Sequence, residues 1–181
     1  MKLNYFGIAG AIIAFVSIAL PWWTVSETAL GLGATYPWYL YNAGIYGAGL
    51  NLWYNWVALL LVILGGIIGL AGSILPDDKK MLMGGGLLEL LSIIIFAAGL
   101  QTDLSSHNLP FSIFSSGTLY DVSFSTYLSY GFWLTLVAAI VMLIAMRYPK
   151  LAPQAPAPPP SSPPSQPPSQ PPSQPPLPTE T

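Results

Sequence analysis

The chain has 181 residues, of which 53% are hydrophobic and 7% charged, against about 25% charged residues in an average soluble domain. Its formal net charge of −2 gives no basis for nucleic-acid binding. Because the chain contains no cysteine, it has no disulfide, thiol chemistry or cysteine-ligated metal site. This composition predicts a membrane protein.

The positive charges fall at three places in the sequence. Lys2 precedes the first apolar run, Lys79 and Lys80 share one short loop, and Arg147 and Lys150 follow the last run. Positive charge is retained on the cytoplasmic side during membrane insertion. We therefore expect a multi-pass protein of the cell membrane, with cytoplasmic N- and C-termini and two large outer loops.

Four apolar stretches match the roughly 20 residues that a helix needs to cross a bilayer. The expected spans are 5–23, 56–75, 81–100 and 130–146. We interpret the first as a retained signal anchor, because Pro21 and two tryptophans follow it where a cleavage site has small residues. Cleavage would leave three spans. Aromatic residues typical of an interfacial belt mark the outer ends: Trp22, Trp23, Trp53, Trp56, Tyr130 and Trp133.

Glycines recur at helical spacing in the second and third expected spans. Gly65, Gly69 and Gly72 share one helix face, and Gly85 opens the third span. In lipid, small residues allow helix backbones to approach closely. The pattern predicts packing within a bundle, and a homo-oligomer seam along Gly65 and Gly69 is the alternative.

Glu89 is the one ionisable residue well inside an expected span. A rise of about 1.5 Å per residue from Met81 places it roughly 12 Å into the hydrocarbon. Gly85 and Ser92 share its face, so we expect Glu89 to point into the bundle. A buried acid there is costly and raises a functional hypothesis. It is either held by a helix neighbour or acts in a proton or cation relay.

The two outer loops are rich in aromatic residues. In the first, Tyr36, Trp38 and Tyr39 lie among glycines, a composition typical of short strands and tight turns. In the second, Phe124 belongs to an alternating stretch that predicts one half-buried strand. We expect one small antiparallel sheet from both loops, with these four aromatics as contact residues. The alternative is that they pack the loops onto the bundle.

The composition changes at Pro149, and Pro163–Pro176 repeats Pro-Pro-Ser-Gln. With no apolar periodicity, residues 149–181 are predicted to form a disordered, polyproline-like cytoplasmic tail. We interpret the tail as a solvated spacer. Docking of a proline-binding cytoplasmic partner is the alternative, because Pro164 and Pro167 match the P-x-x-P pattern.

Two short runs resemble the claudin and peripheral-myelin-protein tetraspan superfamily. Residues 20–26 are similar to the Leu-Pro-x-Trp-x-Val-Ser run that closes the first helix of claudins, and residues 49–53 to their Gly-Leu-Trp signature, without its cysteine pair. The resemblance implies a left-handed four-helix bundle, topped by a small extracellular sheet used for contact or assembly. Its signature residues here are Pro21, Trp22, Trp23, Gly49, Leu50 and Trp53.

The expected fold is therefore an all-α membrane fold over residues 1–148: a four-helix transmembrane bundle with a small extracellular antiparallel β-sheet from the two outer loops. No catalytic motif occurs, and His107 near Asp103 lacks the further ligands of a metal site. We expect no cofactor and a non-enzymatic role in membrane-protein assembly or contact, with the bilayer and a second copy or other membrane proteins as partners. The alternatives are a small transporter or channel component that uses Glu89, or an accessory subunit of a larger membrane complex.

Overall fold

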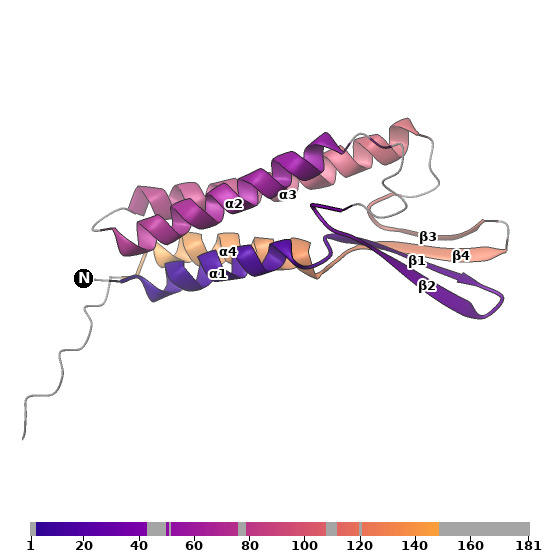
Figure 1. Ribbon diagram of the computed structural model, residues 1–181, viewed down its shortest axis with the longest axis horizontal. Coiled ribbons are helices and arrows are strands. Elements are labelled where there is room, and N and C mark those ends of the chain that lie inside the picture. Colours follow the sequence, from indigo (N-terminus) through magenta and orange to yellow (C-terminus); the bar gives the residue numbers. More distant parts are fainter. Residues whose placement is uncertain are drawn as a thin grey trace, which may run out of the picture.

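The computed structural model describes residues 3–42, 50, 52–75, 79–107, 112–119 and 121–148. Four helices form an elongated bundle and four strands form a sheet that continues the long axis of the bundle (Figure 1). The predicted tail at 149–181 and the signature residue Gly49 lie outside the described residues.

The helices are α1 (Tyr5–Ile18), α2 (Trp53–Ile74), α3 (Lys79–Ser106) and α4 (Tyr130–Ala145). Each helix packs against two others: α2 against α3 and α1, and α4 against α1 and α3. All four helices bury small residues and expose several large apolar ones. In α1, for example, every buried residue is Gly, Ala or Ser.

Within the described residues, α2 and α3 are long and apolar enough to cross a membrane, whereas α1 and α4 are apolar but shorter. The span expected at 5–23 is only 14 residues of helix, about 21 Å at the usual rise. Helix α1 stops early because a residue that precedes proline, here Leu20 before Pro21, disfavours the helical conformation. Helix α3 continues beyond its expected end at 100 as far as Ser106.

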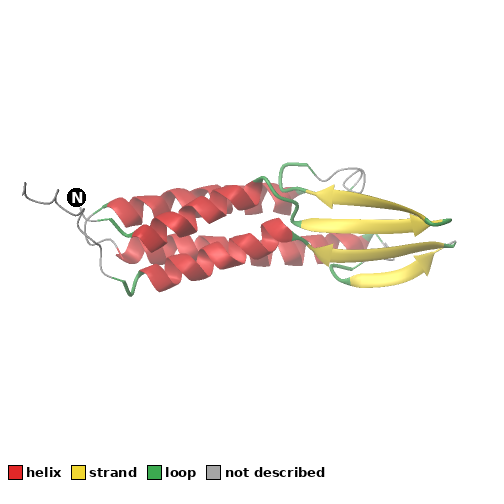
Figure 2. Cartoon of the chain, turned by 90° about the horizontal axis from the view of Figure 1, so that it is seen from below, coloured by secondary structure: helices red, strands yellow, loops and turns green. Residues whose placement is uncertain are grey.

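The strands are β1 (Trp23–Ala29), β2 (Leu32–Trp38), β3 (Ser115–Leu119) and β4 (Val122–Leu128). All neighbouring strands are antiparallel, in the order β2-β1-β4-β3, so the pairing of β1 with β4 joins the two loops into one sheet (Figure 2). This confirms a small antiparallel sheet shared by both loops. The expected all-α class describes only the bundle.

The second loop supplies two strands, where the alternation around Phe124 predicted one. Asp121, with φ of 67°, stands in the turn between β3 and β4. A positive φ is a conformation that aspartate tolerates better than most residues. The chain therefore reverses there and forms a hairpin.

Trp22 lies where the bundle meets the sheet. Its ring is fully buried, with centroids 5.2 Å from Phe96 of α3 and 6.0 Å from Phe132 of α4. Its Nε1 donates to the Ser17 carbonyl oxygen at 3.1 Å. Trp23 is also fully buried. Both tryptophans therefore face the protein core and not the exterior of the bundle, because α1 ends before them and the chain turns them inward.

Candidate functional site

The strand register divides the sheet into two chemically different faces. Side chains alternate along a strand, and directly paired residues share a face. One face, here called the apolar face, carries Trp23, Val25, Ala29, Leu32, Ala34, Tyr36, Trp38, Val122, Phe124 and Leu128, together with Gly117 and the polar residues Glu27, Ser115 and Thr126. The opposite, hydroxyl-rich face carries Thr24, Ser26, Thr28, Gly33, Thr35, Pro37, Ser116, Thr118, Ser123, Ser125 and Tyr127.

The base of the apolar face is part of the protein core. Trp23, Val25, Trp38 and Leu128 are buried in one cluster that also contains Leu104 of α3. The rings of Trp23 and Trp38 meet edge to face, with centroids 5.5 Å apart. These contacts join the base of the sheet to the bundle.

The outer part of the apolar face is uncovered within the described structure. Leu32 is 79% exposed and Ala34 is exposed. The sheet projects past the bundle, so no described helix lies over this part (Figures 1 and 2). A sheet normally buries one face against another layer. The uncovered apolar half is therefore the candidate contact surface.

Leu30 lies at the tip of the β1–β2 hairpin. It is 99% exposed with φ of 51°, and Gly31 beside it has φ of 79°. A two-residue hairpin turn favours positive φ at both positions, but it normally uses Asn, Asp or Gly there. A large apolar residue in this conformation is an outlier, and such strain is concentrated at functional positions.

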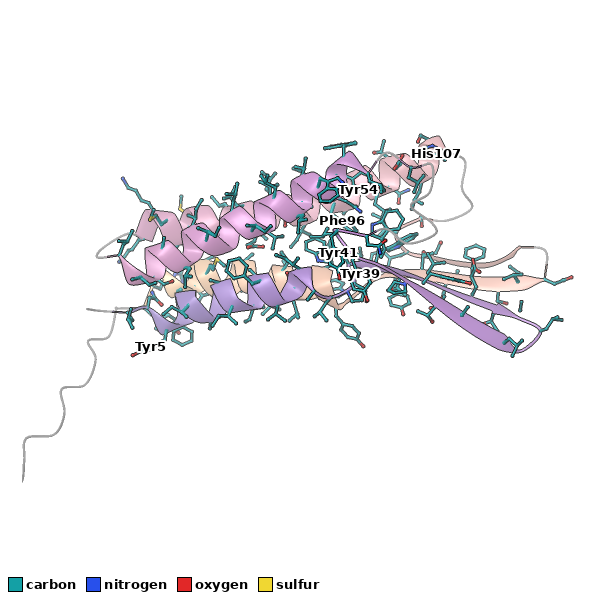
Figure 3. All side chains as sticks on the ribbon, in the orientation of Figure 1. Tyr5, Tyr39, Tyr41, Tyr54, Phe96 and His107 are labelled. Atoms are coloured by element: carbon teal, nitrogen blue, oxygen red, sulfur yellow. The ribbon has the colours of Figure 1, made fainter. Side chains whose placement is uncertain are left out.

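The four aromatic residues predicted as contact residues have different positions. Trp38 is 1% exposed, so it is a core residue and not a contact residue. Tyr36 and Phe124 are half-buried on the apolar face. Tyr39 stacks on Tyr41 with centroids 5.4 Å apart; both tyrosines lie at the junction of bundle and sheet (Figure 3).

Leu30 and Leu32 were not predicted as contact residues, although they are the most exposed large apolar residues described. The available signal was the run Leu30-Gly31-Leu32, in which a turn glycine separates two leucines. Among the claudin-like signature residues, Leu50 packs partly buried against the core, whereas Trp53 is 54% exposed.

Glu89 lies inside the bundle and is fully buried. Neither carboxyl oxygen has a hydrogen-bond partner among the described residues. The side chain lies against Gly65 of α2, where a Cβ would come within 2.8 Å of Glu89 Oε1. Ser92 Oγ donates a hydrogen bond to the Glu89 carbonyl oxygen at 2.7 Å, and not to the carboxyl group.

The glycines of α2 and α3 pack against each other within the chain. A Cβ on Gly85 would come within 2.8 Å of the Gly65 oxygen and 3.0 Å of Gly69 Cα. Gly72 lies in the same way against Met81. The structure thus places the four predicted packing glycines at internal contacts.

Another group of polar side chains lies at the ends of α2 and α3 that are nearer the sheet (Figure 1). Asp103 Oδ1 is 3.4 Å from His107 Nδ1, and the buried Tyr54 hydroxyl is close enough to interact with the Asp103 carboxylate. Neither Tyr54 Oη nor Asp103 Oδ2 has a hydrogen-bond partner of good geometry in the described structure. Among the described residues, no group of three or more His, Cys, Asp or Glu side chains could hold a metal ion.

No family model matches this chain, and no curated protein sequence is significantly similar to it. The residues of the sheet and of the bundle therefore carry the functional argument.

Proposed function

We propose that this chain is a non-enzymatic, four-span membrane protein that assembles with another membrane protein through the apolar face of its outer sheet. The observation that carries the proposal is the uncovered outer half of that face, led by Leu32 at 79% exposure. Uncovered apolar surface of this kind marks interaction sites. The proposed architecture is claudin-like.

The exterior of the bundle supports a membrane location. All four helices expose large apolar side chains: Tyr5, Phe6, Ile12 and Val16 of α1, Leu60, Ile63, Leu64 and Ile67 of α2, Met83, Leu87, Leu91 and Ile94 of α3, and Val137, Ile140 and Ile144 of α4. Water would make this surface costly, whereas hydrocarbon accommodates it. The short helices α1 and α4 connect directly to the sheet. The sheet would therefore begin close to the outer boundary of the bilayer.

The charges support the orientation. Asn4, Ser73 and Ala145 meet at one end of the bundle, because Asn4 Nδ2 donates to the Ala145 oxygen at 2.8 Å and Asn4 N donates to the Ser73 oxygen at 3.0 Å. Lys79 and Arg147 follow at this same end, opposite the sheet (Figure 1). Positive residues favour the cytoplasmic side, so the sheet faces outward.

The absence of cysteine makes the chain suited to site-directed cross-linking. Leu32→Cys places a single thiol on the apolar face of β2, and Thr35→Cys places one on the opposite face. Both positions are exposed. Treated in native membranes with a short thiol-reactive photo-cross-linker, Leu32→Cys should yield an adduct heavier than the 19.4 kDa chain, and Thr35→Cys should remain largely monomeric. A product at twice the chain mass would identify a second copy as the partner.

Equal labelling from both faces, or no adduct from either, would contradict contact through the apolar face. A second variant, Leu32→Glu, should abolish co-purification of the partner, because it places a charge in an apolar contact. The matched substitution Thr35→Glu on the opposite face should leave co-purification intact.

The buried Glu89 supports a second candidate, a small transporter or channel component. Its carboxyl oxygens have no partner among the described residues, and an acid retained inside a membrane bundle is typically functional. Glu89→Gln in proteoliposomes should then abolish ion or proton flux. Without flux in the wild-type protein, the same acid would suit an accessory subunit of a larger complex, which mild extraction would recover intact.

A further inference from the structure

A cavity of about 380 Å³ lies at the outer ends of α2 and α3. It is lined by Trp53 of α2 and by one side of α3, including Ile94, Ala98, Thr102, Asp103 and Ser106. Trp53 is 54% exposed and Ile94 is 62% exposed, so the cavity opens on the outside of the bundle.

The polarity of the cavity changes along α3. Ile94 and Ala98 form its inner part, whereas Thr102, Asp103 and Ser106 form its outer part. At about 1.5 Å per residue, the lining from residue 94 to residue 106 extends over roughly 18 Å. In the proposed membrane location, the cavity lining changes from apolar to polar towards the outer surface. A phospholipid changes in the same order from acyl chain to headgroup.

The outer part of the cavity favours a cation. Asp103 supplies the one carboxylate of its lining and is 8% exposed. His107 and Tyr54 are the titratable groups beside it, and the described lysines and arginine lie at the other end of the bundle. The exposed Trp53 ring adds a π-face, which attracts cations.

The Asp103 carboxylate also discriminates between cationic headgroups, because it accepts hydrogen bonds. A primary ammonium carries three N–H donors, whereas a quaternary ammonium carries none. Only the former can donate a hydrogen bond to the Asp103 carboxylate.

We propose that this cavity binds a phospholipid with an ethanolamine headgroup, its ammonium at Asp103 and Trp53 and an acyl chain along Ile94 and Ala98. The proposal rests on the membrane location in the proposed function, but not on contact through the sheet.

The test uses the full chain in nanodiscs that contain equal amounts of ethanolamine, choline and glycerol phospholipids. Native mass spectrometry after brief detergent release identifies the lipids that remain bound. We expect the wild-type chain to retain the ethanolamine lipid in excess. Asp103→Asn should reduce that excess roughly tenfold, as the loss of a charge-assisted hydrogen bond implies.

Two further variants separate binding from folding. Asp121→Asn removes another outer acid, at an exposed turn position whose positive φ suits asparagine, and should leave the excess unchanged. Ala98→Phe fills the apolar part of the cavity and should lower retention of every lipid there while Asp103 remains in place.

Retention in the bulk lipid ratio, equal retention of choline and ethanolamine lipids, or an unaltered excess in Asp103→Asn would overturn the proposal. These outcomes leave the proposed function untouched. A chain that enters no nanodisc and retains no lipid would instead overturn the membrane location, and the cavity proposal with it.

Discussion

The carboxyl group of Glu89 lies against Gly65, on the glycine-lined contact between α2 and α3. A Cβ on Gly65 would approach Glu89 Oε1 to 2.8 Å, so the absence of a side chain there makes room for the acid. The carboxyl group has no hydrogen-bond partner among the described residues. Glu89 is therefore expected to reduce stability, and its presence favours a role other than packing.

Replacing Glu89 with methionine should stabilise the protein. Methionine has a similar volume and flexible packing, and the change removes two buried polar atoms that lack partners. Removing such atoms is expected to raise the free energy of unfolding by about 1–3 kcal/mol. Thermal unfolding in mild detergent measures this, and a lower midpoint would mean that the carboxyl group has a partner in the folded state.

The close approach of α2 and α3 depends on Gly85. Gly85→Ala would bring a Cβ within 2.8 Å of backbone atoms of Gly65 and Gly69, which must separate the helices. We expect a loss of about 1–3 kcal/mol, as for other over-packed cores.

The adjacent Gly84 provides the matched control for Gly85→Ala. A Cβ there would meet only Ile68, at 3.9 Å, so Gly84→Ala should be neutral or stabilise the helix by up to about 1 kcal/mol. Equal destabilisation by both changes would show that backbone freedom matters there, and not close packing.

Asn4 connects the ends of three helices, since its backbone N–H also donates to the Ser73 oxygen of α2 at 3.0 Å. Its Oδ1 accepts from Gly7 N at 3.1 Å and caps α1, while its Nδ2 donates to the Ala145 oxygen of α4. Asn4→Ala removes both bonds and should cost about 1–2 kcal/mol.

Asn4→Asp separates the two contributions of Asn4. Aspartate retains an acceptor for the N-terminus of α1 but cannot donate to α4. Its unfolding midpoint should therefore lie between those of the wild type and Asn4→Ala. A midpoint equal to that of the alanine variant would assign the whole effect to the bond with α4.

Substitutions of Leu30, at the strained tip of the β1–β2 hairpin, distinguish effects on stability from effects on contact with the partner. Leu30→Asn should stabilise the chain by about 1 kcal/mol, because asparagine tolerates the positive φ of 51°. The same change should reduce cross-linking from Leu32→Cys if the tip contacts the partner. Leu30→Ala removes the side chain without relieving all the strain, so it should reduce cross-linking with little gain in stability.

Local pattern was sufficient to predict the helices and much of the sheet. The apolar runs anticipated all four helices, and the aromatic loops anticipated a shared antiparallel sheet. Local pattern was less informative about helix ends. The first apolar run continues through Leu20, but α1 stops at Ile18 ahead of Pro21, and Trp22 then enters the core.

The sequence by itself determined where helices and strands form, because hydropathy, turn residues and proline act over a few neighbouring positions. It also excluded cysteine chemistry. Only the tertiary structure decided that Trp38 is buried while Leu32 is exposed, that Glu89 meets Gly65, and that Asp103 lines a cavity beside Trp53. These relationships depend on strand register and helix packing, which bring together residues far apart in the chain.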